Sequence, residues 1–269
     1  MDTQLEKAER FRALHARESA FIIPNPWDPG SARLLEQAGF EALATTSAGY
    51  AFSLGLRDNQ VGRERMMAHV RELACATNLP LSVDLENGFG HDPETIAETI
   101  RMTAEAGAVG GSIEDSTGDP AHPLYDLDHA VARIRAAVQA ARALPFPFTL
   151  TARAENFLVG RPDLDDAIAR LRAYQEAGAD VLYAPGPSSL DQVAAVLRAV
   201  DRPVNVLANA GFDRDALSKL GVRRISVGGA LTRAAYGALL RAIAEMRERG
   251  TFVFFKDAVP HGDLQQKFG

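Results

Sequence analysis

The sequence AEAGAVGGS at residues 104–112 contains the pattern from which the fold can be predicted. An amphipathic helix ends at Gly107, which can take the left-handed conformation that stops a helix, and a short apolar strand follows at once. The same arrangement occurs in EQAGFEALA (36–44), QEAGADVLY (175–183) and SKLGVRRIS (218–226), with Gly39, Gly178 and Gly221 as the stops. These repeated junctions predict a chain in which helices and strands alternate.

Outward from these junctions, eight short apolar runs have the character of strands that are covered on both faces. They are FIIP (21–24), ALATT (42–46), LSVDL (81–85), VGGSIE (109–114), FTLTAR (148–153), DVLYA (180–184), VNVLA (204–208) and RISVG (224–228). Amphipathic segments such as DPETIAETIRMTAEAG (92–107) separate them. Eight such units predict an α/β fold, a (β/α)8 TIM barrel of parallel strands. A doubly wound open sheet is the structural alternative.

The domain organisation follows from the same alternation, because no Pro-, Ser- or Gly-rich linker interrupts it. We therefore expect residues 1–269 to form a single (β/α)8-barrel domain. Residues 251–269, TFVFFKDAVPHGDLQQKFG, are more apolar at their start than an exposed tail should be. This predicts an extra C-terminal helical tail that packs against another surface, for which a neighbouring subunit is one candidate.

Composition restricts the partners and the compartment. The formal charge of −6 argues against a nucleic-acid partner, since such partners need a basic surface. The sequence contains no run of about 18 apolar residues, which is the length needed to span a membrane. Its N-terminus lacks the apolar region of a secretory signal. The single cysteine, Cys75, cannot form an internal disulfide, and we expect it to pack in the core. We expect a soluble, cytoplasmic protein.

Acidic residues gather where the predicted strands end, which is the functional face of such a barrel. Asp84 and Glu86 end the third strand, Glu114 ends the fourth, and Asp58 lies on the loop after the second. Carboxylates brought together repel, and a hard divalent cation relieves that repulsion. With no His or Cys nearby, Mg²⁺ or Mn²⁺ is favoured over Zn²⁺. The alternative is that these acids cap helices or pair with basic residues.

Arg153, at the end of the fifth strand, is a candidate for gripping an anionic substrate, because its guanidinium can bind a carboxylate through two hydrogen bonds. The alternative is that it pairs with Glu114 or Glu155 in the barrel rim. Ser47-Ala48-Gly49 offers small residues whose backbone amides could approach an anion.

These strand ends resemble the phosphoenolpyruvate mutase/isocitrate lyase superfamily. The resemblance covers roughly Phe21 to Arg249, and it rests on the segments TTSAG (45–49), GLRD (55–58), VDLENGFG (83–90), SIED (112–115) and TARAE (151–155), in the family's order. It implies an enzyme that makes or breaks a C–C or P–C bond beside a 2-oxo carboxylate, through an enolate stabilised by Mg²⁺. It also implies a homo-oligomer, a dimer or a tetramer with exchanged C-terminal helices.

By position, the resemblance implies a role for each site residue. Asp84 is similar to the direct Mg²⁺ ligand, Glu86 and Glu114 to acids that hold the metal through water, and Asp58 to an acid that also faces the substrate. Ser47 with the Ala48 and Gly49 amides resembles the cradle for the substrate carboxylate, and Arg153 the residue that grips the 2-oxo acid or enolate.

The loop after the fourth strand departs from the family pattern. The lyases carry a catalytic cysteine there and the phosphonomutases a Lys and an Asn, but here the loop is DSTGDPAHPLYD (115–126). His122 is its only imidazole and is a candidate acid or base if the loop closes; the alternative is a solvated side chain. Asn205 and Asn209 are candidates for hydrogen bonding to the substrate, or for turn chemistry.

Three functional hypotheses remain at this stage. The first is a Mg²⁺-dependent enzyme that acts on a small 2-oxo acid, of the pyruvate, oxaloacetate or 2-oxoglutarate type, or on its adduct. The second is a barrel isomerase or synthase that binds phosphate on the glycines after strands seven and eight, at 209–211 and 226–230. The third is a protein that binds a 2-oxo acid and releases it unchanged.

Overall fold

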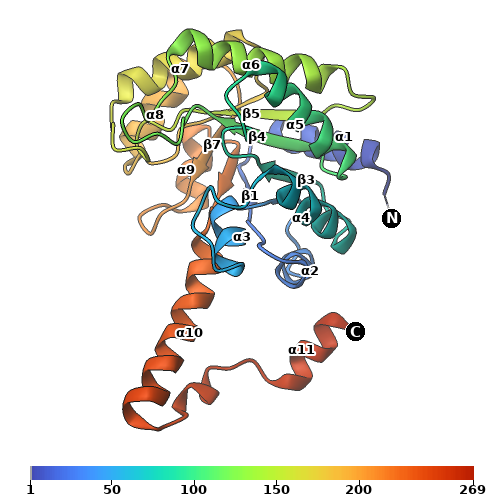
Figure 1. Ribbon diagram of the computed structural model, residues 1–269, viewed down its shortest axis with the longest axis vertical. Helices are drawn as coiled ribbons and strands as arrows, with labels where there is room; N and C mark the ends of the chain where they lie inside the picture. Colours follow the sequence, from blue (N-terminus) through green and yellow to red (C-terminus); the bar gives the residue numbers. More distant parts are fainter. Residues whose placement is uncertain (1) are drawn as a thin grey trace.

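The computed structural model describes residues 2–269 and contains one sheet of eight parallel strands (Figure 1). The strands are β1 (Phe21–Ile23), β2 (Leu43–Ala44), β3 (Leu81–Asp84), β4 (Gly110–Glu114), β5 (Thr149–Arg153), β6 (Val181–Tyr183), β7 (Val204–Leu207) and β8 (Arg224–Ser226). From β2 to β8 each strand pairs with its neighbour in sequence, and β1 pairs with β8. Between β1 and β2 the Ala44 amide donates to the Pro24 carbonyl at 3.1 Å, which brings the two edges together. The predicted (β/α)8 barrel is confirmed.

Helices connect the strands and cover the outside of the barrel. They are α1 (Gln4–His15), α2 (Pro29–Gln37), α3 (Ser47–Ser53), α4 (Arg63–Ala76), α5 (Pro93–Glu105), α6 (Leu127–Arg142), α7 (Leu164–Glu176), α8 (Leu190–Ala199), α9 (Arg214–Leu220), α10 (Ala230–Arg249) and α11 (His261–Phe268), with a 3₁₀ turn, η1 (Val253–Lys256). The predicted stop glycines all have left-handed φ angles, for example 100° at Gly107 and 105° at Gly221. The helices therefore end at these glycines for the expected reason, because glycine takes the left-handed conformation without strain.

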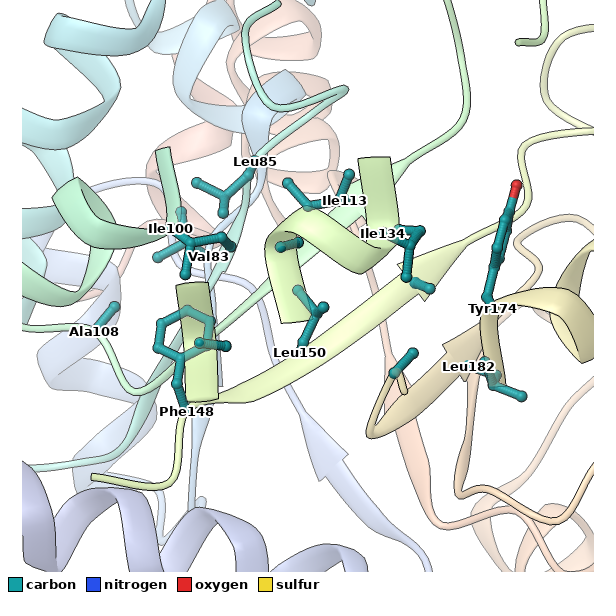
Figure 2. Close-up of a cluster of buried hydrophobic side chains, with 14 of the residues drawn as sticks. Val83, Leu85, Ile100, Ala108, Ile113, Ile134, Phe148, Leu150, Tyr174 and Leu182 are labelled. Carbon is teal, nitrogen blue, oxygen red and sulfur yellow. The ribbon is translucent and has the colours of Figure 1, made fainter. Parts of the chain in front are cut away.

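The hydrophobic core lies between the sheet and the helices. Successive residues of a strand face opposite sides, so Val83 and Ile113 point outward and pack among helical side chains such as Ile134 (Figure 2). The residues that alternate with them, such as Ser82 and Ser112, line a cavity inside the barrel. Small polar side chains thus replace the large apolar ones that often fill a barrel interior, which leaves room for a ligand.

Helix α1 closes the end of the barrel opposite that cavity. Phe11 is fully buried, and a Cβ atom on Gly110 would lie only 2.8 Å from the Phe11 ring. The His15 ring meets the rings of Phe11 and Phe21 edge-on. We call the rings of Phe11, His15 and Phe21 the α1 plug. These rings fit because β4 begins with a glycine, Gly110, which has no side chain to occupy their space.

The C-terminal segment leaves the body of the barrel. Helix α10 extends away from it, and α11 returns to lie beside α2 (Figure 1), where the Gln37 side-chain amide donates to the Lys267 carbonyl. Large apolar side chains stay exposed on both arms, among them Leu240 at 64% and Phe255 at 68%. The predicted helical tail is present, and it does not bury its own apolar side chains.

One sequence expectation is wrong. Cys75 is exposed, because α4 buries the face that carries Met66, Val70 and Leu73, and Cys75 lies off that face. No helix among residues 2–269 is long and apolar enough to span a bilayer. The expectations of a single domain and of a cytoplasmic location stay predictions.

If the α1 plug stabilises the barrel, replacing Phe11→Ala should lower the free energy of unfolding by about 3–5 kcal/mol, since it removes a buried aromatic ring and leaves a cavity. Leu5→Ala on the same helix is the matched control, because Leu5 is half exposed, and it should change stability by less than about 0.5 kcal/mol. Urea unfolding followed by circular dichroism measures both. Equal effects of the two substitutions would contradict the plug.

Candidate active site

A cavity of about 340 Å³ opens at the carboxyl ends of the strands and continues down into the barrel. This is the face on which barrel enzymes carry their chemistry, because the strand-to-helix loops converge there. Seven of the predicted site residues line the cavity: Ser47, Ala48, Asp58, Asp84, Glu114, Arg153 and Asn205. Gly49, Glu86, His122 and Asn209 do not line it.

Arg153 is the centre of the cavity mouth, which we define as Arg153, Asp84, Glu114 and Glu155. Its guanidinium lies 2.9 Å from Asp84 Oδ1, 3.1 Å from Glu114 Oε2 and 2.8 Å from Glu155 Oε1. Neighbouring strands carry these residues, and β4 pairs with β5 with Glu114 opposite Arg153. The alternative in which Arg153 pairs with Glu114 or Glu155 is therefore observed, and Asp84 joins the cluster from β3.

The mouth places three carboxyl groups around one guanidinium. Burial alone would lower the pKa of Arg153, but the charges of Glu155, Glu114 and Asp84 raise it well above its usual range. Burial raises the pKa of Glu114 and of Glu155, and the attraction of Arg153 offsets only part of that shift. One guanidinium serves several carboxylates, so a further cation would find a favourable potential here.

Asp84 also anchors the loop that follows β2. Its Oδ2 atom accepts hydrogen bonds from the Ser47 hydroxyl at 3.0 Å and from the Ser47 amide at 3.2 Å. At the start of α3 the Thr46 hydroxyl caps the helix by accepting from the Gly49 amide at 3.1 Å. Ser47 and Ala48 line the cavity and Gly49 does not, so Ser47 and Ala48 are the better candidates for contacting a substrate carboxylate.

Glu86 and Asp58 extend the acidic region around Asp84. Burial, with the charges of Asp84 and Asp58, raises the pKa of Glu86 to about 8, and Glu86 Oε1 is buried without a hydrogen-bond partner. Glu86 has a φ of 51°, an unusual value for a residue other than glycine. Asp58 lies on an exposed loop at the rim of the cavity. Loss of water on the side that faces the cavity, and then the charge of Asp84, raise the pKa of Asp58.

Whether these acids suit a metal ion depends on the kind of ligand atom that they offer, which is oxygen. The unpartnered oxygen of Glu86 and the surplus of carboxylates suit a hard divalent cation. Within residues 2–269, however, no three Asp, Glu, His or Cys side chains are placed as a ready metal-binding group. The reason lies in Arg153, which holds Asp84 and Glu114 against its own guanidinium. The metal ligands predicted from the sequence stay predictions.

Two predicted residues lie away from the cavity. The His122 side chain is 85% exposed, and its Nδ1 atom is 3.4 Å from Asp119 on the same loop. The Asn209 side-chain oxygen accepts from the Gly211 amide at 2.8 Å, which is turn chemistry. Neither contacts the mouth in this structure, and the role of His122 would need the loop to move.

Asn25, which the sequence analysis overlooked, bears on the phosphate-binding hypothesis. It follows β1, is buried, and its side-chain oxygen accepts from the amides of Val227 and Gly228 at 3.0 and 2.9 Å. Those amides belong to the glycine-containing segment that a phosphate would need. Because Asn25 already occupies them, this segment is a poor phosphate site. An Asn directly after a strand was the available signal.

Tyr183 and Arg224, which the sequence analysis did not single out, also line the cavity, together with Glu155 and Ser226. The Arg153 guanidinium carbon lies 5.2 Å from the centre of the Tyr183 ring. Arg224 and Ser226 are two residues apart on β8, and the alternation of strand side chains turns both inward. That alternation could have identified them, had residues before the strand ends been considered.

Comparison with known proteins identifies the family. Residues 11–247 match the model of the phosphoenolpyruvate phosphomutase family. The chain belongs to this family. A provisionally assigned lyase/mutase from Burkholderia cenocepacia J2315 has a crystal structure that is 63% identical, covers 99% of this chain and 96% of its own, and superposes with a TM-score of 0.97. The resemblance inferred from the strand ends is confirmed.

Two further relatives are informative. Oxaloacetate decarboxylase from Paraburkholderia xenovorans (strain LB400) is 35% identical over 72% of this chain and 66% of its own. The structure of oxaloacetate acetylhydrolase in complex with the product oxalate is 26% identical, covers 99% of this chain and 95% of its own, and has a TM-score of 0.86. Both names refer to the same four-carbon 2-oxo acid.

Proposed function

We propose that this protein is a Mg²⁺- or Mn²⁺-dependent enzyme that breaks or forms a C–C or P–C bond beside the carbonyl of a small 2-oxo acid of the oxaloacetate type. The observation that supports this most is the mouth itself, where carboxylates from three adjacent strands surround one buried arginine. The two relatives named for oxaloacetate favour that substrate over the other 2-oxo acids.

Asp84, Glu86 and Glu114 are the residues that would hold the cation, with Asp58 at its side. The bound cation would supply Lewis-acid stabilisation of the negative charge that develops on the 2-oxo oxygen. The proposal requires Asp84 to exchange part of its pairing with Arg153 for the cation. Such an exchange keeps the charge of the mouth balanced, because the substrate brings a carboxylate for Arg153.

The chain's own residues would bind and orient the substrate. Arg153 can donate through Nε and both Nη atoms, and its surroundings keep it charged at any working pH. Ser47, whose hydroxyl now donates to Asp84, is placed to donate to a carboxylate instead. Buried Asn205 offers a neutral hydrogen-bonding group lower in the cavity. A mouth that is mostly buried excludes water from the reacting bond.

The metal assignment predicts a loss of ligand binding in a conservative variant. Asp84→Asn should weaken the Mg²⁺-dependent binding of oxalate at least about 100-fold, because it removes a charged ligand without changing its size. Oxalate is the probe because its adjacent carboxylates chelate a divalent cation. Calorimetric titration with Mg²⁺, and then with chelator, measures the effect.

Asp215→Asn is the matched control for that experiment, since Asp215 is an exposed acid on α9 that pairs only with Arg214 in the same helix, and it should bind as wild type does. Wild-type affinity in the Asp84→Asn variant would rule out this metal site. Binding of a 2-oxo acid that is then released unchanged would favour a binding protein over an enzyme.

We further propose that the exposed apolar side chains of α10 and residues 251–269 pack on a second copy of the chain, giving a homo-oligomer. Leu239, Leu240 and Ile243 on α10 and Phe252 and Phe255 beyond it are all exposed. Apolar surface of this extent on a protruding arm favours a protein interface.

Removing residues 251–269 should therefore lower the number of copies in the oligomer, because it deletes half of that apolar arm. Light scattering coupled to size exclusion measures the mass, and circular dichroism confirms that the barrel remains folded. An unchanged number of copies in the truncated protein would show that the tail is not needed for the interface.

A further inference from the structure

Arg224 occupies the bottom of the same cavity whose mouth is described above. It begins β8, and its side chain reaches Thr151 on β5. Its Nε donates to Asn205 Oδ1 at 2.9 Å and one Nη to Thr151 Oγ1 at 3.0 Å. The residue is 5% exposed, and its Nη1 atom has no hydrogen-bond partner. We call Arg224, Asn205 and Thr151 the cavity floor.

The charge of Arg224 is unmatched. Across residues 2–269 the buried Arg170 pairs with carboxylates within 3.1 Å, as does Arg153 at the mouth. The buried Arg133 also lacks a carboxylate, but its guanidinium lies over the Tyr125 ring and donates to three backbone carbonyls. Arg224 lines a cavity and has no carboxylate within ion-pair distance. Burial lowers the pKa of Arg224 to about 10, which still leaves the group charged at neutral pH. A buried, unpaired guanidinium is costly, so its presence beside open space points to an anion.

The floor and the mouth belong to one continuous space. Arg224, Asn205 and Ser226 line the cavity together with Asp84 and Arg153. On β5, Thr151 of the floor precedes Arg153 of the mouth by two residues, a rise of about 6.6 Å. A four-carbon chain with a carboxylate at each end can reach across such a step, whereas oxalate cannot.

We propose that the floor is a carboxylate subsite, in which Arg224 Nη1 and the polar side chains beside it bind the distal carboxylate of a four-carbon 2-oxo dicarboxylate. The proposal rests on the proposed function, because the 2-oxo group and the adjacent carboxylate remain at the mouth. It makes Arg224 the residue that selects dicarboxylates over monocarboxylates. A neutral floor would leave the second carboxylate buried without a partner.

Two probes separate the floor from the mouth. Oxalate is too short to reach Arg224 from the mouth, whereas 3,3-difluorooxaloacetate has the full four-carbon chain and no C3 hydrogen that could be lost to form an enolate. With Mg²⁺ present, wild type should bind both. Arg224→Met should leave the dissociation constant of oxalate within about twofold and weaken 3,3-difluorooxaloacetate at least about tenfold, as expected for a lost charge-assisted pair.

Arg223→Met is the matched control. Arg223 neighbours Arg224 but points to the opposite side of the strand, where it donates to the Glu18 and Gly221 carbonyls. This variant should bind both probes as wild type does. Arg224→Lys, which keeps the charge on a shorter reach, should recover part of the affinity for 3,3-difluorooxaloacetate.

The outcomes distinguish the two proposals. If wild type binds neither probe with Mg²⁺, the proposed function fails. If wild type binds both and Arg224→Met weakens neither, or weakens both equally, the floor subsite fails while the proposed function stands.

A crystal structure of wild type with 3,3-difluorooxaloacetate gives a test that needs no variant, should Arg224→Met not fold. The distal carboxylate should lie within hydrogen-bond distance of Arg224 Nη1. A water or an inorganic anion at that atom, with the distal carboxylate elsewhere, would overturn the inference.

Discussion

The cluster of Arg153 with Asp84, Glu114 and Glu155 is the interaction on which the rest of this structure depends. It forms because adjacent parallel strands end close together, with Glu114 opposite Arg153 and Asp84 opposite Ser112, and because side-chain alternation turns the acidic residues and Arg153 inward. Buried charges of this kind are costly unless each has a partner. The cluster therefore ties the charge balance of the cavity to the pairing of three strands.

Around that cluster, separate parts of the protein supply stability and chemistry. The apolar core between the sheet and the helices leaves the barrel interior free for small polar side chains. Behind the mouth, the Asp115 carboxylate accepts hydrogen bonds from Arg170, from the Tyr174 hydroxyl and from the Glu155 amide. This buried network fixes the loop after β4 and the start of the loop after β5. Charged groups at the mouth are thus held by neighbours that do not face the ligand.

The sequence predicted the parts of this arrangement that follow from local periodicity. Strand runs and stop glycines predicted the barrel, and the barrel predicted that Asp84, Glu114 and Arg153 would meet. Arg224 was missed because only residues at the carboxyl ends of strands were taken as site candidates, whereas Arg224 begins β8 and lies deeper in the barrel. Cys75 was misplaced because a single position near a helix end does not reveal its face. The conformations of the loops that carry His122 and Asn209 depend on contacts that no short pattern encodes.

The central claim is that the acids around Arg153 form a cation site. The most direct test is anomalous diffraction from crystals of the wild-type protein grown with Mn²⁺ and oxalate. The account predicts one strong peak among Asp84, Glu86 and Glu114, with oxalate between the cation and Arg153. An absent peak, or a peak that these three carboxylates do not surround, would contradict it.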